Sequence, residues 1–210
     1  SNHDICYARS TDGGKSWEKS TGVKYNLPIS AATAEYACQI PPKSELINQT
    51  SMTTDDAGHP FIATYWREIG TDVPQYHVIY KIDSDWKVSD CGFRKTAFSL
   101  SGVGTKRIPI SRPQILVSGK GEKAIVRMIY RDSERDEKVS LATCNSITQN
   151  RWQITDLTHS GVGAWEPSYD TELWKNKKQI HVFLQNVEQI DSEGVAKSEN
   201  EMINVLELKL

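Results

Sequence analysis

The segment Ser10-Thr11-Asp12-Gly13-Gly14-Lys15-Ser16-Trp17 is the part of the sequence that decides the fold. An Asp close to two Gly residues predicts a tight turn, because the carboxylate accepts hydrogen bonds from nearby backbone N–H groups and Gly adopts positive φ easily. The Trp at the end of the segment predicts an aromatic side chain that packs back onto a hairpin. We therefore expect the turn of a β-hairpin here, with strands on both sides.

The rest of the chain also predicts short strands. Apolar or alternating runs are separated by clusters of Gly, Asp, Asn, Lys and Pro, and no stretch sustains a helical period of 3.6 residues. Three segments repeat one plan. Their expected strands lie at 51–54, 61–66, 75–80 and 86–89; at 114–117, 124–130, 138–144 and 152–155; and at 169–174, 180–185 and 202–208.

Equivalent aromatic residues set the period of this repeat. Trp86 and Trp152 are 66 positions apart, and Tyr65 and Tyr130 are 65 apart. Repeats of four short strands at such a period are typical of propeller blades. The sequence therefore predicts an all-β fold, a β-propeller of four-stranded antiparallel blades that forms one domain over residues 1–210.

The expected strands do not make a whole number of blades. They group as two, four, four and three, and a ring cannot close from such a set without leaving an exposed sheet edge. We therefore expect the chain to be the C-terminal part of a longer propeller, about three and a half blades. The blades missing from its N-terminal side would then be its partner within the same ring.

Composition narrows the class of function. The chain has 25 Lys and Arg against 27 Asp and Glu, a net charge of -2, which predicts no nucleic-acid partner. No apolar run approaches the ~20 residues of a membrane span. Its four cysteines, Cys6, Cys38, Cys91 and Cys144, form no C-x-x-C pair and are expected to be thiols in the core, with disulfides left open. No cofactor is predicted, although a divalent metal stays open.

The segment 10–17 fits the Asp-box, S-x-D-x-G-x-[ST]-W, at every defined position. The chain thus resembles the BNR-repeat or Asp-box propellers, whose best-known members are the sialidases, or neuraminidases. A wider match is to the BNR-repeat family of polysaccharide-degrading bacteria, through residues 3–10 (HDICYARS), 111–115 (SRPQI), 165–170 (WEPSYD) and 181–185 (HVFLQ). In such propellers the Asp-box is structural and lies far from the active face.

The resemblance implies activity on carbohydrate outside the cytoplasm, in the periplasm, at the cell surface or after secretion. Known activities of the family include lyases that cleave uronate-containing polysaccharides such as ulvan, and a glycosidase that removes rhamnose from glucuronate. A sialidase fits less well, because the arginine triad and the Tyr–Glu pair of that class cannot be matched residue by residue. Arg107-Ile108-Pro109 has the letters of a sialidase signature but follows the Asp-box, so we treat it as coincidence.

Strand direction nominates one face of the propeller as the site. The first two strands of a blade are antiparallel, so the start of the first and the end of the second emerge together, beside the start of the third. The polar and aromatic residues at these points are Asn48, Gln49, Tyr65, Trp66, Arg67, Gln75, Tyr76, His77, Arg112, Gln114, Tyr130, Arg131, Asp132, Trp165, Glu166, Tyr169, Gln185 and Asn186.

A uronate lyase needs a group that neutralises the carboxylate and groups that move protons. Arg112 and Arg131 suit the first role, because a guanidinium grips a carboxylate with two hydrogen bonds. Tyr76, His77 and Tyr130 suit the second.

A hydrolase instead needs two acids ~5–9 Å apart, which Glu166 with Asp132 or Asp170 would supply. The predicted catalytic set is therefore Arg112, His77, Tyr130, Tyr76 and Glu166. Predicted substrate contacts are Gln49, Trp66, Gln75, Gln114, Arg131, Trp165, Tyr169 and Gln185, with Trp66 and Trp165 stacking on sugar rings.

Structural interpretations compete with these assignments. The charged run 131–138 is expected to be a solvated loop as a whole, and Tyr65 and Tyr130 are equally well explained as packing residues of the repeat. The rival function is a non-catalytic carbohydrate-binding or scaffold propeller, since a fold does not determine an activity. Arg112 is the residue that the sequence favours most for substrate binding or catalysis.

Overall fold

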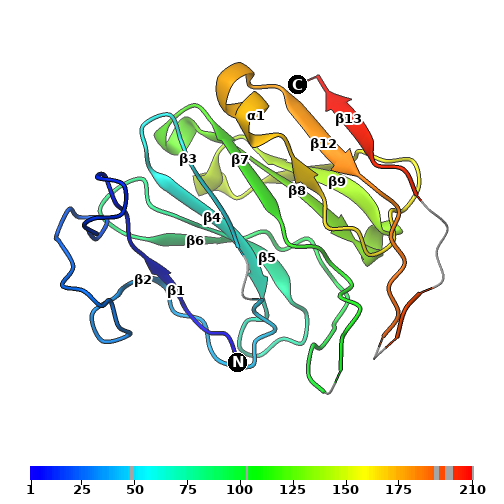
Figure 1. Ribbon diagram of the computed structural model, residues 1–210, viewed down its shortest axis with the longest axis horizontal. Helices are drawn as coiled ribbons and strands as arrows, with labels where there is room; N and C mark the ends of the chain where they lie inside the picture. Colours follow the sequence, from blue (N-terminus) through cyan, green and yellow to red (C-terminus); the bar gives the residue numbers. More distant parts are fainter. Residues whose placement is uncertain (48–49, 103, 192–193, 197–200, 210) are drawn as a thin grey trace.

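The computed structural model describes residues 1–47, 50–102, 104–191, 194–196 and 201–209. Within them thirteen strands form four antiparallel sheets, which follow one another across the molecule (Figure 1). We call the sheets blades I to IV. They consist of β1 (Ile5–Tyr7) and β2 (Glu35–Cys38) in blade I; β3 (Ser51–Thr54), β4 (Pro60–Trp66), β5 (Gln75–Tyr80) and β6 (Lys87–Asp90) in blade II; β7 (Gln114–Ser118), β8 (Ile125–Asp132), β9 (Lys138–Cys144) and β10 (Trp152–Asp156) in blade III; and β11 (Ser168–Tyr169), β12 (Ile180–Leu184) and β13 (Asn204–Leu208) in blade IV.

Blade II packs on its two neighbours through opposite faces, as β4 illustrates. Successive side chains of a strand point to opposite faces. Phe61, Ala63 and Tyr65 face the core shared with blade III, whereas Ile62 and Trp66 face the core shared with blade I. Every residue of β4 is therefore buried.

The grouping of strands confirms the predicted fold class. Blades of two, four, four and three strands occur in the predicted order, and the chain is all-β apart from short helical segments. The inner strands β3 and β7 of blades II and III lie beside each other, as strands around a propeller axis do (Figure 1). The four sheets form an open arc, which is consistent with partial propeller blades.

One predicted strand is wrong. The expected strand at 169–174 is only two residues long in the structure, and α1 (Thr171–Lys177) follows it directly. Asp170 starts the helix, because its carboxylate accepts a hydrogen bond of 2.8 Å from the backbone N–H of Leu173. The buried side chain of Trp174 anchors α1 in the core between blades III and IV.

The charged run 131–138 is not the uniform solvated loop that was expected. Arg131 and Asp132 belong to β8 and are buried, whereas the 3-10 helix η2 (Ser133–Arg135) that follows has no buried residue. Asp132 pairs with Arg94, from the connection after β6, at 2.7 Å. Arg94 could not be paired with Asp132 from the sequence because 38 positions separate them.

All four cysteines are free thiols. Cys91 and Cys144 are buried as expected, whereas Cys38 is half-buried and Cys6 is exposed. No helix in the described part of the chain is long and apolar enough to cross a membrane.

Two adjacent carboxylates in the β3–β4 turn join blades II and III. Asp55 accepts a hydrogen bond of 2.7 Å from the backbone N–H of Gly121, and Asp56 accepts one of 3.0 Å from that of Gly119. The backbone N–H of Asp56 in turn donates to the carbonyl of Gly119. The turns of the two inner strand pairs are thus bonded directly to each other.

The turn at 10–17 is held together by Asp12. One carboxylate oxygen accepts hydrogen bonds from the backbone N–H groups of Lys15 and Ser16, and the other accepts from the Ser16 hydroxyl at 2.6 Å. These bonds, the Ser16 hydroxyl first, lower the pKa of Asp12 to about 2.

We expect Asp12→Ala to lower Tm by on the order of a few degrees at neutral pH, because the turn loses its hydrogen-bond acceptors. A depressed carboxyl pKa adds stability above the unfolded value of ~3.9, and this stability is lost as pH falls toward the folded value. The difference in Tm should therefore shrink toward pH 2, as calorimetry would measure. Thr11→Ala, at the neighbouring exposed position, is the control. An unchanged Tm with lost turnover would instead place this turn in the active site.

Candidate functional site

Arg112 and Glu166 meet where blades III and IV begin. Arg112 stands two residues before β7, and Glu166 two residues before β11. Ser111 ties the Arg112 backbone to the end of β8, because its hydroxyl accepts a hydrogen bond from the backbone N–H of Arg131 and its own N–H donates to the Arg131 carbonyl. Both side chains are about one third exposed, 31% for Arg112 and 37% for Glu166.

The guanidinium of Arg112 is only loosely paired. Glu166 accepts a hydrogen bond of 2.8 Å from the backbone N–H of Arg112, but its other oxygen lies 3.8 Å from Nη1, beyond hydrogen-bond distance. The Nε of Arg112 is buried and has no hydrogen-bond partner among the described residues. The side chain is thus held near a carboxylate while its donors stay available.

Tyr65 is a second residue with a polar group unpartnered among the described residues, and it lies within electrostatic range of Arg112 and Glu166. Its side chain is fully buried, and its hydroxyl has no partner within the described parts of the chain. Burial raises the pKa of Tyr65, and the charge of Glu166 raises it further, whereas those of Arg112 and Arg131 lower it. Tyr65 is therefore a neutral phenol whose hydroxyl senses all three charges. We call Tyr65, Arg112, Arg131 and Glu166 the Arg112 cluster.

Arg131 supplies the fixed, buried positive charge of this cluster. It is buried, and its guanidinium donates to the carbonyls of Ile108 and Trp165 at 3.0 and 3.3 Å. No carboxylate lies within ion-pair distance of it among the described residues.

The electrostatics of Glu166 reflect these neighbours. Burial raises the pKa of Glu166 above its ordinary value, and the N–H and charge of Arg112, together with the charge of Arg131, offset part of the effect. A carboxylate with a raised pKa is a stronger base when it is ionised.

Three of the predicted catalytic residues lie in the interior instead. Tyr76 and Tyr130 are fully buried with ring centroids 4.9 Å apart, and the Tyr76 hydroxyl donates to the carbonyls of Ser111 and Arg131. The Tyr76 hydroxyl is committed to these carbonyls. The hydroxyl of Tyr130 is buried and unpartnered among the described residues, as that of Tyr65 is, so its role in proton transfer stays a prediction.

His77 and Trp66 face blade I rather than the Arg112 cluster. Their rings stack with centroids 3.4 Å apart, and the Trp66 Nε1–H donates to Glu68 at 2.9 Å. Burial lowers the pKa of His77 to about 3, so its imidazole is neutral at physiological pH. Stacking of Trp66 on a sugar, predicted from the sequence, would require displacing His77 from its face.

Most of the predicted substrate contacts already have protein partners. Gln75 bonds to the backbone of Arg94 through both its amide oxygen and its amide nitrogen. The side chains of Trp165, Tyr169 and Gln185 donate to carbonyls of other segments, those of Phe183, Ile115 and Glu201. Gln114 is half-buried on β7. Gln49, like Asn48, lies outside the described residues.

The acids offered for a hydrolase are engaged as well. Asp132 is buried against Arg94, and Asp170 caps α1. Burial raises the pKa of Asp132, while the hydrogen bond and charge of Arg94 oppose that rise. Glu166 is partly buried and, of the three, is the acid that lies next to Arg112.

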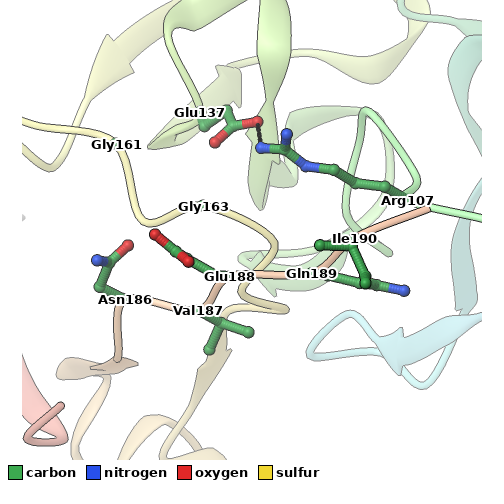
Figure 2. Close-up of a pocket in the computed structure, with 9 residues that line it drawn as sticks. All are labelled: Arg107, Glu137, Gly161, Gly163, Asn186, Val187, Glu188, Gln189 and Ile190. Atoms are coloured by element: carbon green, nitrogen blue, oxygen red, sulfur yellow. Dashed lines mark hydrogen bonds and ion pairs between the residues drawn. The ribbon is translucent and has the colours of Figure 1, made fainter. Parts of the chain in front are cut away.

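A separate hollow of about 400 Å³ lies near Arg107 (Figure 2). Figure 2 shows Arg107 directed at Glu137, with Glu188 on the opposite wall. Its backbone walls approach closely at Gly163, where an added Cβ would lie 2.1 Å from the Val187 carbonyl oxygen. Because Arg107 is paired with Glu137, this hollow offers an anionic ligand fewer free hydrogen-bond donors than the Arg112 cluster does.

Sequence reasoning placed Arg112 and Glu166 on one face but assigned no role to Tyr65. The structural explanation of Tyr65 as a packing residue of the repeat holds for its ring. This ring lies edge-on to that of Tyr76, with the ring centroids 6.0 Å apart. Only the missing partner of its hydroxyl marks it as functional, and a sequence does not contain that signal. Within the described residues, no group of three or more His, Cys, Asp or Glu side chains is placed to hold a metal.

Comparison with known proteins finds a family model that matches the first part of the chain. Residues 1–93 match a family model described as a BNR repeat-containing family member. The match covers blades I and II, while Arg112 and Glu166 lie beyond it. No curated protein matches the chain.

Proposed function

We propose that the Arg112 cluster binds and cleaves a uronate-containing polysaccharide or oligosaccharide. The match of residues 1–93 to the BNR repeat-containing family, which suggests a carbohydrate-related, sialidase-like fold, supports this proposal. Elimination by a lyase is favoured over hydrolysis by a glycosidase. The observation that carries the proposal is the pair of buried donors without a partner among the described residues, Arg112 Nε and Tyr65 Oη, together with the partly exposed carboxylate of Glu166 next to Arg112.

Unpartnered donors are expensive in a folded protein. A buried donor without an acceptor costs about 1–3 kcal/mol. A uronate carboxylate would satisfy Arg112, whose planar guanidinium matches it with two hydrogen bonds. The fixed charge of Arg131 would add to the attraction without occupying the site.

The proposed elimination uses three side chains. Arg112 neutralises the carboxylate at C6, which acidifies the proton on C5. Glu166 takes this proton, and the electrons of the C5–H bond form the C4–C5 double bond. The C4–O bond breaks, and Tyr65, a neutral phenol with a free hydroxyl, protonates the leaving oxygen.

The neighbouring acids favour elimination over hydrolysis. Hydrolysis with two acids requires a second accessible carboxyl near Glu166. Asp132 and Asp170 are committed to Arg94 and to the N-terminus of α1. Elimination requires only one carboxyl group, that of Glu166.

Incubation of the full-length protein with a uronate-containing polymer such as ulvan tests the proposal. A lyase produces a rise in the ultraviolet absorbance of unsaturated uronate. Release of a sugar without this rise would indicate a glycosidase. Binding without turnover would favour the non-catalytic carbohydrate-binding propeller, and absence of both binding and turnover would overturn the proposal.

The pH dependence follows from Glu166. As a base it must be ionised, so kcat/KM should fall as pH drops through its pKa, which lies above the ordinary 4.5. Because the charge of Arg112 favours the ionised form, Arg112→Gln should move the carboxyl titration of Glu166 to higher pH. Carbon NMR of labelled glutamate would measure this shift without relying on activity. A shift to lower pH would contradict the proposed coupling.

We further propose that the protein works outside the cytoplasm, where polysaccharides of this kind occur, and that other blades complete the ring around the Arg112 cluster. The open arc of four sheets and the three-stranded blade IV support this arrangement. Those blades would supply further substrate contacts.

A further inference from the structure

A groove beside blade II is separate from the Arg112 cluster. It has a volume of about 640 Å³ and adjoins a hollow of about 440 Å³. Glu45, Arg67 and Ser99 line both, so the two spaces form one depression. We call this depression the Arg67 groove.

The positive charges of the groove are unpaired. Arg67 donates to the carbonyls of Thr71 and Lys43 at 3.2 and 2.9 Å. No carboxylate lies within 4.0 Å of the charged groups of Arg67 or Lys43 in the described residues. Two carboxylates, Glu45 and Asp72, also line the groove. That of Glu45 accepts hydrogen bonds from the Ser99 hydroxyl and the Leu100 N–H at 3.1 and 2.6 Å.

Ser44 points to a ligand independently of these charges. It lines the groove and is only 2% exposed, and its hydroxyl has no hydrogen-bond partner among the residues described. On either side, Lys43 and Glu45 adopt left-handed φ angles of 59° and 64°, which are unfavourable for side chains of their kind. Such strain gathers at ligand-binding segments.

The groove also adjoins the Arg112 cluster. Phe98 lines its smaller part and packs edge-on against Tyr65, with ring centroids 6.1 Å apart. The charge of Glu45 acts on the hydroxyl of Tyr65 from this side. A chain molecule bound at the cluster would therefore reach the groove at its next units.

We propose that the Arg67 groove is a second sugar subsite, which takes an anionic sugar of the glycan held at the Arg112 cluster. This inference rests on the proposed function. Arg67 and Lys43 bind the anionic group, and the Ser44 hydroxyl bonds a sugar hydroxyl. Leu46 and Leu100 in the wall contact the apolar edge of the ring. The protein consequently prefers a polymer to a terminal disaccharide.

Binding as a function of chain length tests the subsite. The full-length protein carrying Tyr65→Phe, which removes the proposed proton donor, is titrated calorimetrically with a uronate-containing disaccharide and hexasaccharide. We expect the hexasaccharide to bind more tightly. Adding Arg67→Gln should weaken the hexasaccharide about ten-fold, the loss of one charge-assisted contact, and leave the disaccharide unchanged.

Three controls sharpen the result. Arg107→Gln removes a cation outside the groove and should change neither affinity. Ser44→Ala removes a hydroxyl without a protein partner, so it keeps the fold and should weaken only the hexasaccharide. A hexasaccharide with reduced carboxyl groups should be insensitive to Arg67→Gln.

The outcomes separate the two proposals. Equal affinities of the two oligosaccharides, or equal effects of Arg67→Gln on both, would overturn the subsite while leaving the Arg112 cluster intact. Failure of both oligosaccharides to bind the protein would overturn the proposed function, and the subsite with it.

Discussion

Replacing Arg112 with Ala should lower kcat/KM on a uronate-containing glycan by about 10²–10³-fold, the loss typical when one preorganised charge-stabilising donor is removed. This corresponds to about 2.7–4 kcal/mol of transition-state stabilisation. The reason is that the guanidinium lies near Glu166, where we propose that substrate binds, and that its Nε has no partner among the described residues. Initial rates and Tm are measured on the same variant.

The fold should tolerate this change. The hydrogen bond from Arg112 to Glu166 comes from the backbone N–H, which Ala retains. Arg107→Ala removes a cation paired with Glu137 and serves as the matched control. If Arg112→Ala lowers Tm and barely changes the turnover of the folded fraction, Arg112 is a structural ion-pair residue and leaves the site.

The second large effect is expected for Glu166→Gln, which should reduce kcat by about 10²–10⁴-fold, the contribution typical of a general base. The amide oxygen of Gln still accepts the Arg112 N–H, so the local backbone is kept. The acidic limb of the pH profile should disappear in any residual activity, since Gln does not titrate.

This second readout distinguishes a base from a structural residue. Asp170→Asn alters a carboxylate that caps α1 and lies outside the proposed mechanism. It should change Tm more than kcat. Persistence of the acidic limb in Glu166→Gln would mean that another group takes the proton.

Much of the fold could be predicted from the sequence because it depends on local signals. Alternating apolar residues give the strands, and several expected bounds, such as those of β3, β5 and β9, coincide with the observed ones. The exception at 169–174 arose where a single capping residue, Asp170, outweighed a short apolar run. In so short a segment, the same residues are compatible with a helix cap and with the start of a strand.

The site was less predictable, because it depends on which face of a strand each side chain occupies and on what covers it. Position along the strand nominated Arg112 and Glu166 for one face, and in the structure Arg112 Nη1 lies 3.8 Å from a carboxylate oxygen of Glu166. It could not show that Arg94 would cross to Asp132, or that the Tyr76 hydroxyl would bond to carbonyls of Ser111 and Arg131. These contacts join residues dozens of positions apart and exist only after the blades have packed.

The bonds of Asp55 and Asp56 to Gly121 and Gly119 bear on how the molecule opens. Surface-turn amides usually exchange their hydrogens with solvent readily, since only local fluctuation is needed to expose them. Here the amides of Gly119 and Gly121 are capped by carboxylates of the neighbouring blade. The acceptor of Gly121, Asp55, is buried, so this amide should exchange slowly and report how often blades II and III part. The acceptor of Gly119, Asp56, is exposed, so that amide should exchange faster.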